Sequence, residues 1–463
     1  MTVDLDLASR VLDLVRAASP GAQAEVTVDR TEQALTRFAK SFIHQNMTDA
    51  GIGVRLRLHD GGRTASGTTT TADADGLRAL VDRTLAAARL CPPDPQWPGL
   101  TPPTAVRAAA AMDEDTAQAT PAARAERVRA FVDGAGGLET AGYCGTTLSQ
   151  VTFANSAGHT AQAQAAEAAM SCIARCPDED RAPADGVARL VTRRLADLDG
   201  GVLGVRAATK ARAAVRPVEL PPGRYEVVLE PAAVNDLLAN LAMYGFNAKA
   251  VAERQSFVEL DRVQFDPAVT LVDDPLDGGL PFDVEGTPRD RLTLVDAGVT
   301  TAVAHDRRTA AAAGTTSTGH AVPGAGAFGA LLCDLRLVPD SSRPRVSGEA
   351  DGPAADADVA ELVSQVGRGL LVSDLWYTRV LDPRSLVMTG LTRNGVWLIE
   401  DGQITGPVQN LRFTQSYPDA LAPGAVLGVG THAIALPADW GTRTYFAPPL
   451  RLASWNCTGN ASG

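Results

Sequence analysis

The chain has 463 residues, of which 45% are hydrophobic, enough to bury more than one core. Its 42 basic and 54 acidic residues give a net charge of −12, which repels nucleic-acid phosphates and anionic lipid surfaces. The composition therefore argues against nucleic-acid and membrane partners and against a largely disordered chain.

The N-terminal sequence MTVDLDLASRVLDLVRAA has no basic region and carries three Asp within its first 13 residues, so it predicts an amphipathic helix rather than a signal peptide. No apolar run is long enough to span a bilayer. Six sparse, irregularly spaced cysteines are typical of a reducing compartment, so we expect a cytoplasmic protein. Cys172 and Cys176 are expected to pack as small hydrophobic residues on one strand, and Cys457 to be an exposed thiol near the chain end.

In the first half of the chain, residues 24–30 and 53–67 alternate apolar and polar side chains, which predicts strands with a hairpin turn at residues 60–62. Asp73 or Asp75 can cap a helix that stops before Cys91. A proline-rich connector follows to about Pro103. Later elements are expected to be a helix that ends at Gly134 and three strands over residues 140–176, with turns near 145 and 155–158.

The stretch from Leu195 to Pro222 is rich in Ala, Arg, Gly and Pro, and we place a domain boundary there, giving domains 1–216 and 217–463. The second domain is expected to contain a helix over 232–246 and a strand-rich tail. Residues 339–358 are acidic and rich in Pro, Ser and Gly, which predicts a mobile loop. The expected fold is α+β, with an N-terminal antiparallel sheet carrying helices on one side and a strand-rich, barrel-like C-terminal domain.

Histidine spacing does not predict a zinc site in this chain. A catalytic zinc needs imidazoles or thiolates that converge, usually with two ligands on one element. The six histidines are never closer than fifteen residues, at His44, His59, His159, His305, His320 and His432. They form no HExxH, HExxxH or HxH pair, and the chain has no convincing nucleophile elbow or phosphate-binding glycine motif.

Two charged groups could still carry chemistry. Asp283 and Glu285 share a face if the backbone is extended, as paired carboxylates for acid–base work would require. The surrounding Gly and Pro residues favour an acidic turn paired with Arg289 or Arg291 instead. Residues 305–308, reading HDRR, could orient an anionic substrate group through a guanidinium fork, or could be a solvated or interfacial run of charges.

The segment Pro281–Ala321 resembles one protein family, the TldD/TldE (PmbA) group of metallopeptidase-related proteins. We call it the signature segment; its family form is approximately PxDxEGxPxxRxxLxxxGVLxxxLxDxxTAxxxGxxSTGNA, with His320 here in place of the last Asn. The resemblance extends over most of the chain. The further matching stretches are GIGVR at 51–55, NSAG at 155–158, GLLVSDLW from Gly369 and GVWLIEDGQITGPV from Gly395.

In the metal-binding TldD branch of that family, a helix reading LLHEAVGHG supplies two histidine ligands and a glutamate, and a cysteine near the C-terminus completes the site. In this chain the three helix positions are Ala239, Asn240 and Tyr244, and the expected cysteine position, residues 442–449, contains none. The chain therefore resembles the TldE/PmbA-like branch, which lacks the zinc motif.

This resemblance implies a heterodimer with a TldD-like HExxxH protein that carries zinc, while this chain has no catalytic residue, metal ligand or cofactor of its own. It would shape a shared cavity for an unstructured peptide or amide substrate, in proteolysis or in peptide or antibiotic maturation. Thr414-Gln415-Ser416 replaces a common AGN, which suggests a divergent copy. The cavity residues expected on this basis are Asn240, Tyr244, Asp283, Glu285, His305, Arg307 and His320.

Two alternatives stay open at this point. The chain could hydrolyse amides alone, using Asp283, Glu285, His305 or His320 with an unrecognised metal. It could instead be a self-associating peptide-binding protein without a catalytic partner.

Overall fold

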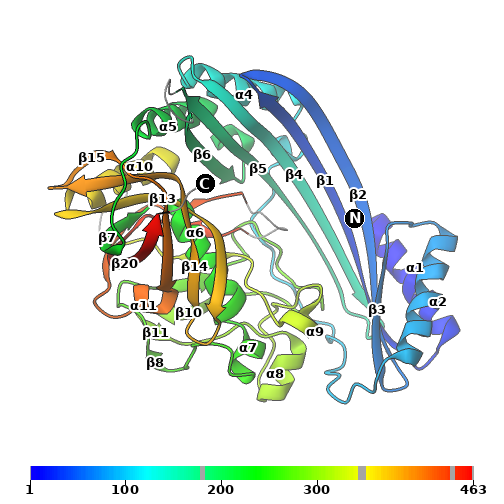
Figure 1. Ribbon diagram of the computed structural model, residues 1–463. Coiled ribbons are helices and arrows are strands. Elements are labelled where there is room, and N and C mark those ends of the chain that lie inside the picture. Colours follow the sequence, from blue (N-terminus) through cyan, green and yellow to red (C-terminus); the bar gives the residue numbers. More distant parts are fainter. Residues whose placement is uncertain (1, 178–182, 342–350, 438–443, 461–463) are drawn as a thin grey trace.

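The computed structural model describes residues 2–177, 183–341, 351–437 and 444–460. A long N-terminal sheet stands beside a barrel formed by the C-terminal half (Figure 1). The strands of the N-terminal sheet are antiparallel and lie in the order β3-β2-β1-β4-β5-β6. Their bounds are β1 Gln23–Ala39, β2 Phe42–Asp60, β3 Arg63–Thr69, β4 Glu139–Asn155, β5 Thr160–Cys176 and β6 Ala184–Thr192.

Residues 139–176 form two long strands, so the expected three strands were wrong. The error arose at Gly145, which is not in a turn but is paired with Leu35 of β1 and Ala169 of β5. A Cβ atom at this glycine would lie 2.5 Å from the Leu35 side chain. The glycine therefore makes room for a neighbouring side chain within a continuous strand.

Helices cover one face of this sheet, as predicted. They are α1 (Thr2–Ala18), α2 (Ala74–Leu90), α4 (Pro121–Gly134) and α5 (Gly200–Ala213). Val26 and Val28 of β1 pack with α1 and α2, and Phe38 on the same face meets Phe131 of α4 at 5.8 Å between ring centroids. Asp73 caps α2 by accepting the Gly76 N–H. Strand alternation leaves the opposite face of β1 turned towards the C-terminal half.

Helix α5 was missed by the sequence analysis, which took this stretch as part of an inter-domain segment. Its glycines have a packing role: Cβ atoms at Gly200 and Gly204 would lie 2.0 and 2.2 Å from the Arg127 and Phe131 carbonyl oxygens of α4. Glycine is unfavourable in a helix interior, but here it permits close contact between two helices. The division at residues 216 and 217 stays a prediction.

The C-terminal barrel closes because β13 pairs with both β7 and β14, completing the ring β13-β7-β20-β16-β14. These strands are β7 Gly223–Leu229, β13 Arg368–Asp382, β14 Val387–Glu400, β16 Leu411–Ser416 and β20 Leu450–Asn460, with β15 (Gln403–Pro407) and β17 (Val426–Val429) attached. Cys457 lies in β20, where it is paired with Phe413 of β16, and it is 2% exposed. The expectation of an exposed thiol was therefore wrong. The predicted α+β fold with a barrel-like C-terminal part is confirmed.

Short strands continue the N-terminal sheet beyond β6. In sheet order they are β18 Ile434–Ala435, β19 Phe446–Ala447, β12 Leu335–Leu337, β9 Leu271–Asp273, β10 Leu292–Asp296, β11 Val299–Thr300 and β8 Arg262–Val263. The remaining helices are α3 Glu114–Ala117, α6 Pro231–Asn240, α7 Ala248–Ala252, α8 Arg307–Ala313, α9 Ala325–Phe328, α10 Asp351–Ser364 and α11 Tyr417–Ala420, with a 3₁₀ turn at Leu195–Asp197. In the part of the chain that the structure describes, no helix combines the length and apolarity needed to cross a membrane.

Helix α10 corrects the loop expected at 339–358, of which residues 342–350 lie outside the described part. The acidic character of this stretch has a structural use, because the Asp358 carboxylate accepts the N–H groups of Thr431 and His432 at 2.7 and 2.8 Å. Helix α6 also departs from expectation: after Asn240 it continues as a π-helical turn, Leu241–Gly245.

Replacing Trp455 with Ala should lower the free energy of unfolding by about 3–5 kcal/mol. Trp455 is fully buried in the barrel and packs on Phe413 and Tyr417, with ring centroids 5.2 and 5.9 Å away. Denaturant unfolding would measure the change. The control is Phe42→Ala, since Phe42 is 69% exposed and its truncation should shift the free energy by less than about 0.5 kcal/mol. Equal effects would contradict a barrel packed around Trp455.

Candidate functional site

Asp283 sits in a turn of the signature segment and accepts three backbone hydrogen bonds. The donors are the N–H groups of Glu285, Thr287 and Ala321, each at 2.9 Å. Burial and the nearby Glu285 carboxylate raise the pKa of Asp283 to about 8, against these donors, which favour the charged form. The Asp283 side chain thus joins the start of the signature segment to its end at Ala321.

A second buried group surrounds Asp273 at the end of β9. Its Oδ1 accepts from Arg289 Nη2 at 2.7 Å and lies 3.1 Å from His320 Nε2. Its Oδ2 accepts the N–H groups of Cys333 and Asp334 at 3.1 and 2.8 Å. The Arg289 guanidinium also contacts Asp334 at 3.0 Å, and the charges of Arg289 and His320 hold the pKa of Asp273 well below its usual range despite burial.

Arg289 therefore does not pair with the acidic turn, and Arg291 lies 3.9 Å from Asp274 instead, so the expected pairing with Arg289 or Arg291 was wrong. Glu285 instead pairs with Arg57 of β2 at 2.6 Å, and Arg57 also contacts Glu25 of β1 at 3.0 Å. Burial raises the pKa of Glu25 to about 7, although Arg57 acts in the opposite direction. The acidic turn is thus attached to the N-terminal sheet through an arginine far away in sequence.

The HDRR block at residues 305–308 is interfacial. Asp306 caps α8 by accepting the Thr309 N–H at 2.7 Å, and Arg308 binds both carboxylate oxygens of Asp94 at 2.8 and 2.7 Å. Arg307 Nη2 donates to the carbonyl oxygens of Pro98 and Leu100. Both guanidinium groups therefore contact the proline-rich connector rather than forming a free fork. The ring of His305 is half-buried, and burial lowers its pKa.

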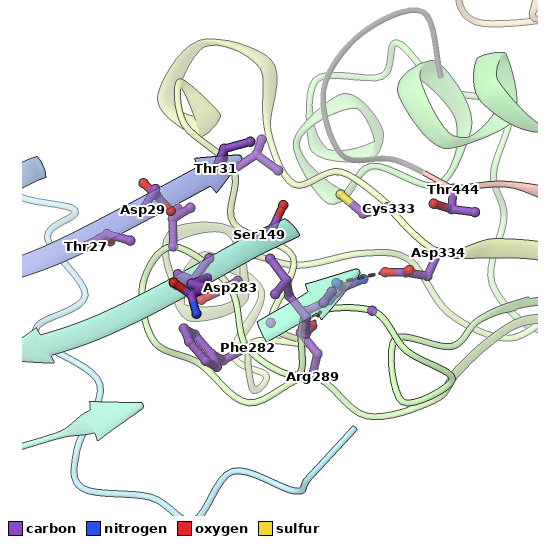
Figure 2. Close-up of a pocket in the computed structure, with 18 of the residues that line it drawn as sticks. Thr27, Asp29, Thr31, Ser149, Phe282, Asp283, Arg289, Cys333, Asp334 and Thr444 are labelled. Carbon is purple, nitrogen blue, oxygen red and sulfur yellow. Dashed lines mark hydrogen bonds and ion pairs between the residues drawn. The ribbon is translucent and has the colours of Figure 1, made fainter. Parts of the chain in front are cut away.

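One cavity, of about 360 Å³, lies between the signature segment and the open face of the N-terminal sheet, and we call it the signature cavity. Figure 2 shows the polar strip that faces it, with Thr27, Asp29 and Thr31 on β1 and Ser149 on β4. Asp283 and His320 line it. Glu285 lines an adjoining cavity of about 680 Å³ with Arg57 and Arg308, and the two cavities share lining residues such as Thr27 and Val284.

Another cavity, of about 490 Å³, lies against helix α6 and β13, and we call it the α6 cavity. Ala239, Asn240 and Tyr244, the three positions aligned with the metal-binding helix, all line it. Tyr445, within the stretch where the family's cysteine is expected, lines it as well. The structure thus brings together Asn240 and Tyr244 but separates them from Asp283, Glu285 and His320. Whether any of the seven predicted residues contacts a substrate stays a prediction.

Sequence reasoning missed a polar group in the α6 cavity, centred on Asp236. Its carboxylate accepts from Tyr417 Oη at 2.6 Å, Thr378 Oγ1 at 2.7 Å and Asn240 Nδ2 at 3.3 Å. Asp236 could have been found, because it precedes Asn240 by one helical turn and so shares its face. Tyr417 and Thr378 come from distant elements, and no sequence signal relates them to α6.

The side chains at the aligned positions do not fit zinc. Ala239 offers no donor atom, the Asn240 amide nitrogen is bonded to the Asp236 carbonyl oxygen at 2.9 Å, and Tyr244 offers only a phenol. Among the described residues, no three His, Cys, Asp or Glu side chains gather as a metal site would require.

Replacing Arg289 with Met should lower the free energy of unfolding by about 3–5 kcal/mol, because Asp273 and Asp334 would be left buried without their cation. Arg291→Met is the matched control. Its guanidinium is 60% exposed and 3.9 Å from Asp274, so its loss should cost less than about 1 kcal/mol. Chemical denaturation of both variants gives the comparison, and a mild effect at Arg289 would contradict its structural role.

Comparison with solved structures shows the same fold at low sequence identity. The structure matches TldE from Thermococcus kodakarensis with a TM-score of 0.83 and 17% identity, covering 98% of this chain and 100% of that chain. It matches a candidate modulator of a DNA gyrase from Thermotoga maritima with a TM-score of 0.80 and 17% identity, covering 98% and 99%. A similarly described protein from Bacteroides thetaiotaomicron gives a TM-score of 0.80 and 18% identity, covering 99% of each chain.

A search of curated proteins finds no match to the chain. The model of the PmbA/TldA metallopeptidase C-terminal domain matches residues 222–459, which is just over half of the chain and includes the barrel, α6 and the signature segment. The chain therefore belongs to the PmbA/TldD metallopeptidase family.

Proposed function

We propose that this chain is the non-zinc subunit of a TldD/TldE-type zinc peptidase or amidase and forms part of the wall of a shared substrate cavity. One observation carries the proposal. The positions aligned with the family's metal-binding helix line a cavity of about 490 Å³, but they bear Ala239, Asn240 and Tyr244. A cavity is present at these positions while their side chains lack the ligand chemistry, which is the arrangement expected of a partner that binds substrate without activating water.

The zinc and the catalytic carboxylate would then belong to a TldD-like partner with an intact HExxxH helix. The substrate would be an unstructured peptide or another amide, in the cytoplasm, and the reaction could serve peptide or antibiotic maturation. The likeness to TldE from Thermococcus kodakarensis agrees with this assignment at the level of the fold.

The contacts of the signature segment disfavour a self-sufficient hydrolase. Both ring nitrogens of His320 are engaged, Nδ1 with Thr318 at 2.8 Å and Nε2 with Asp273 at 3.1 Å. The Asp283 carboxylate accepts hydrogen bonds from three backbone N–H groups. The Glu285 carboxylate accepts from the Arg57 guanidinium and from the Arg307 N–H. Asp283, Glu285 and His320 would have to give up buried hydrogen bonds before they could bind a metal or move a proton, whereas His305 Nδ1 is enclosed without a hydrogen-bond partner among the described residues. A self-associating peptide-binding protein remains the second candidate, since it would use the same cavities.

The test is to purify this chain alone, an HExxxH-containing TldD-like protein alone, and the two after co-expression, and to measure peptide and amide cleavage by each. The expected result is cleavage by the co-expressed pair and no cleavage by this chain alone. Full activity of this chain alone would overturn the proposal. A pair that forms no complex and gains no activity would favour the self-associating peptide-binding protein.

Within an active pair, Tyr244→Ala should change kcat or KM by several-fold or more because it alters the cavity wall, while the zinc content of the pair stays the same. Tyr377→Ala is the matched control, since this tyrosine is 62% exposed on β13 and does not line the α6 cavity. Loss of zinc in the Tyr244 variant would show that α6 supports the metal as well as the cavity wall.

A further inference from the structure

Asp236 is a carboxylate in the wall of the α6 cavity that is hydrogen-bonded but has no cationic partner. Its three side-chain hydrogen bonds come from a phenol, a hydroxyl and an amide, at Tyr417, Thr378 and Asn240. In the described ranges no Arg, Lys or His nitrogen lies within 4.0 Å of it. Carboxylates in such enclosed positions are usually paired with a cation.

The nearest guanidinium on the cavity wall is already used. Arg189 of β6 lines the α6 cavity but binds Asp374 at 2.6 Å, and Asn394 donates to the same carboxylate at 2.7 Å. Among the described residues that line the cavity, Asp236 and Asp374 are two carboxylates and Arg189 is the one guanidinium, so this part of the wall is negatively charged when both carboxylates are ionised. Burial raises the pKa of Asp236 to about 6, which leaves it mostly ionised at pH 7.

A further acceptor lies beside Asp236 on the same helix. Asn235 Oδ1 is enclosed and has no hydrogen-bond donor among the described residues, and Asn235 also lines the cavity. Three hydrogen bonds leave a carboxylate with capacity for one more donor. The Asp236 carboxylate therefore keeps an acceptor position for an N–H donor of a ligand in the cavity, whereas the Asn235 oxygen is enclosed and not exposed to that ligand.

The rest of the wall suits an organic cation rather than a bare ion. Tyr143, Tyr244, Trp376 and Tyr445 line the cavity, and aromatic faces attract ammonium groups. A cavity of about 490 Å³ is within the range that binds small molecules and far exceeds the space that a metal ion needs.

We propose that the α6 cavity binds a primary ammonium group attached to an apolar or aromatic body, with the ammonium nitrogen donating to the Asp236 carboxylate. This deepens the proposed function, on which its biological meaning rests, because the α-ammonium of a peptide or a lysine side chain would carry such a group. Binding itself needs only this chain, so it can be tested without a partner.

The experiment is calorimetric titration of the purified chain at pH 7 with phenethylammonium and with its neutral counterpart 2-phenylethanol. Phenethylammonium should bind at least about tenfold more tightly than 2-phenylethanol, because only the ammonium can form a charge-assisted hydrogen bond with the carboxylate. Asp236→Asn should remove that difference. Asp29→Asn is the matched control, because burial also raises the pKa of Asp29, which lines the signature cavity instead, and it should leave binding unchanged.

Further probes separate the two sources of the ammonium group. Phenylalanine amide carries an α-ammonium, and Nα-acetyl-lysine amide carries a side-chain ammonium, so their relative affinities show which is preferred. If Asp236→Asn does not fold, as judged by circular dichroism, a crystal structure of the wild-type chain with phenethylammonium decides, with the nitrogen expected within hydrogen-bond distance of Asp236.

Equal affinity for the amine and the alcohol, or full affinity in a folded Asp236→Asn variant, would overturn the proposal. Displacement of the amine by millimolar calcium or potassium, together with Asp236-dependent binding of that ion, would also overturn it in favour of a metal-ion site. If the amine does not bind, the proposed role in a two-chain peptidase still stands, because that role is tested by cleavage assays of the co-expressed pair.

Discussion

The buried contact between Asp273 and Arg289 is the interaction on which the middle of the molecule depends. It lies where β9, the signature segment and residues 333–334 meet, and the carboxylate of Asp273, at the end of β9, contacts the other two segments. A carboxylate that is fully enclosed can stay charged only with such partners, so their positions are fixed relative to one another. The turn that contains Asp283 and Glu285 follows from this arrangement, since Arg289 also donates to the Leu280 carbonyl oxygen at its start.

This constraint helps to explain how the acids, arginines and histidine of the signature segment are held in place. Asp283 joins two ends of the segment, Glu285 attaches it to β2 through Arg57, and Arg307 and Arg308 attach it to the connector. The signature segment thereby fixes the open face of the N-terminal sheet against the C-terminal half. The polar cavities between them follow from that placement.

Helix α6 connects the hydrophobic core to the cavity on which the proposed function rests. Leu237, Leu238 and Leu241 are buried in the main core, and the other side of the helix carries Asp236, Asn240 and Tyr244 into the α6 cavity. The helix ends in a π-helical turn, a feature often found at functional sites. A wall of this kind is rigid on its core side and chemically variable on its cavity side, so ligand preference can change without loss of the fold.

Much of the fold was predictable from the sequence, because the spacing of apolar residues and the residues at turns and helix caps determine local secondary structure. Strand alternation in residues 24–30 and the Asp73 cap are examples, and the resemblance in the signature segment correctly indicated the family. Predictions failed where glycine serves close packing, as at Gly145 and Gly204, and where distant partners decide burial, as for Cys457. The contacts Arg57–Glu285 and Asp236–Tyr417 join residues separated by 228 and 181 positions, and no local pattern predicts them.

The central claim, that this chain forms a cavity wall and holds no catalytic metal, is tested most directly by native mass spectrometry of the separated subunits after co-expression with a TldD-like partner in zinc-supplemented medium. We expect that zinc remains with the partner and that this chain has the mass of its bare polypeptide. One zinc ion per copy of this chain, retained after mild chelation, would contradict it.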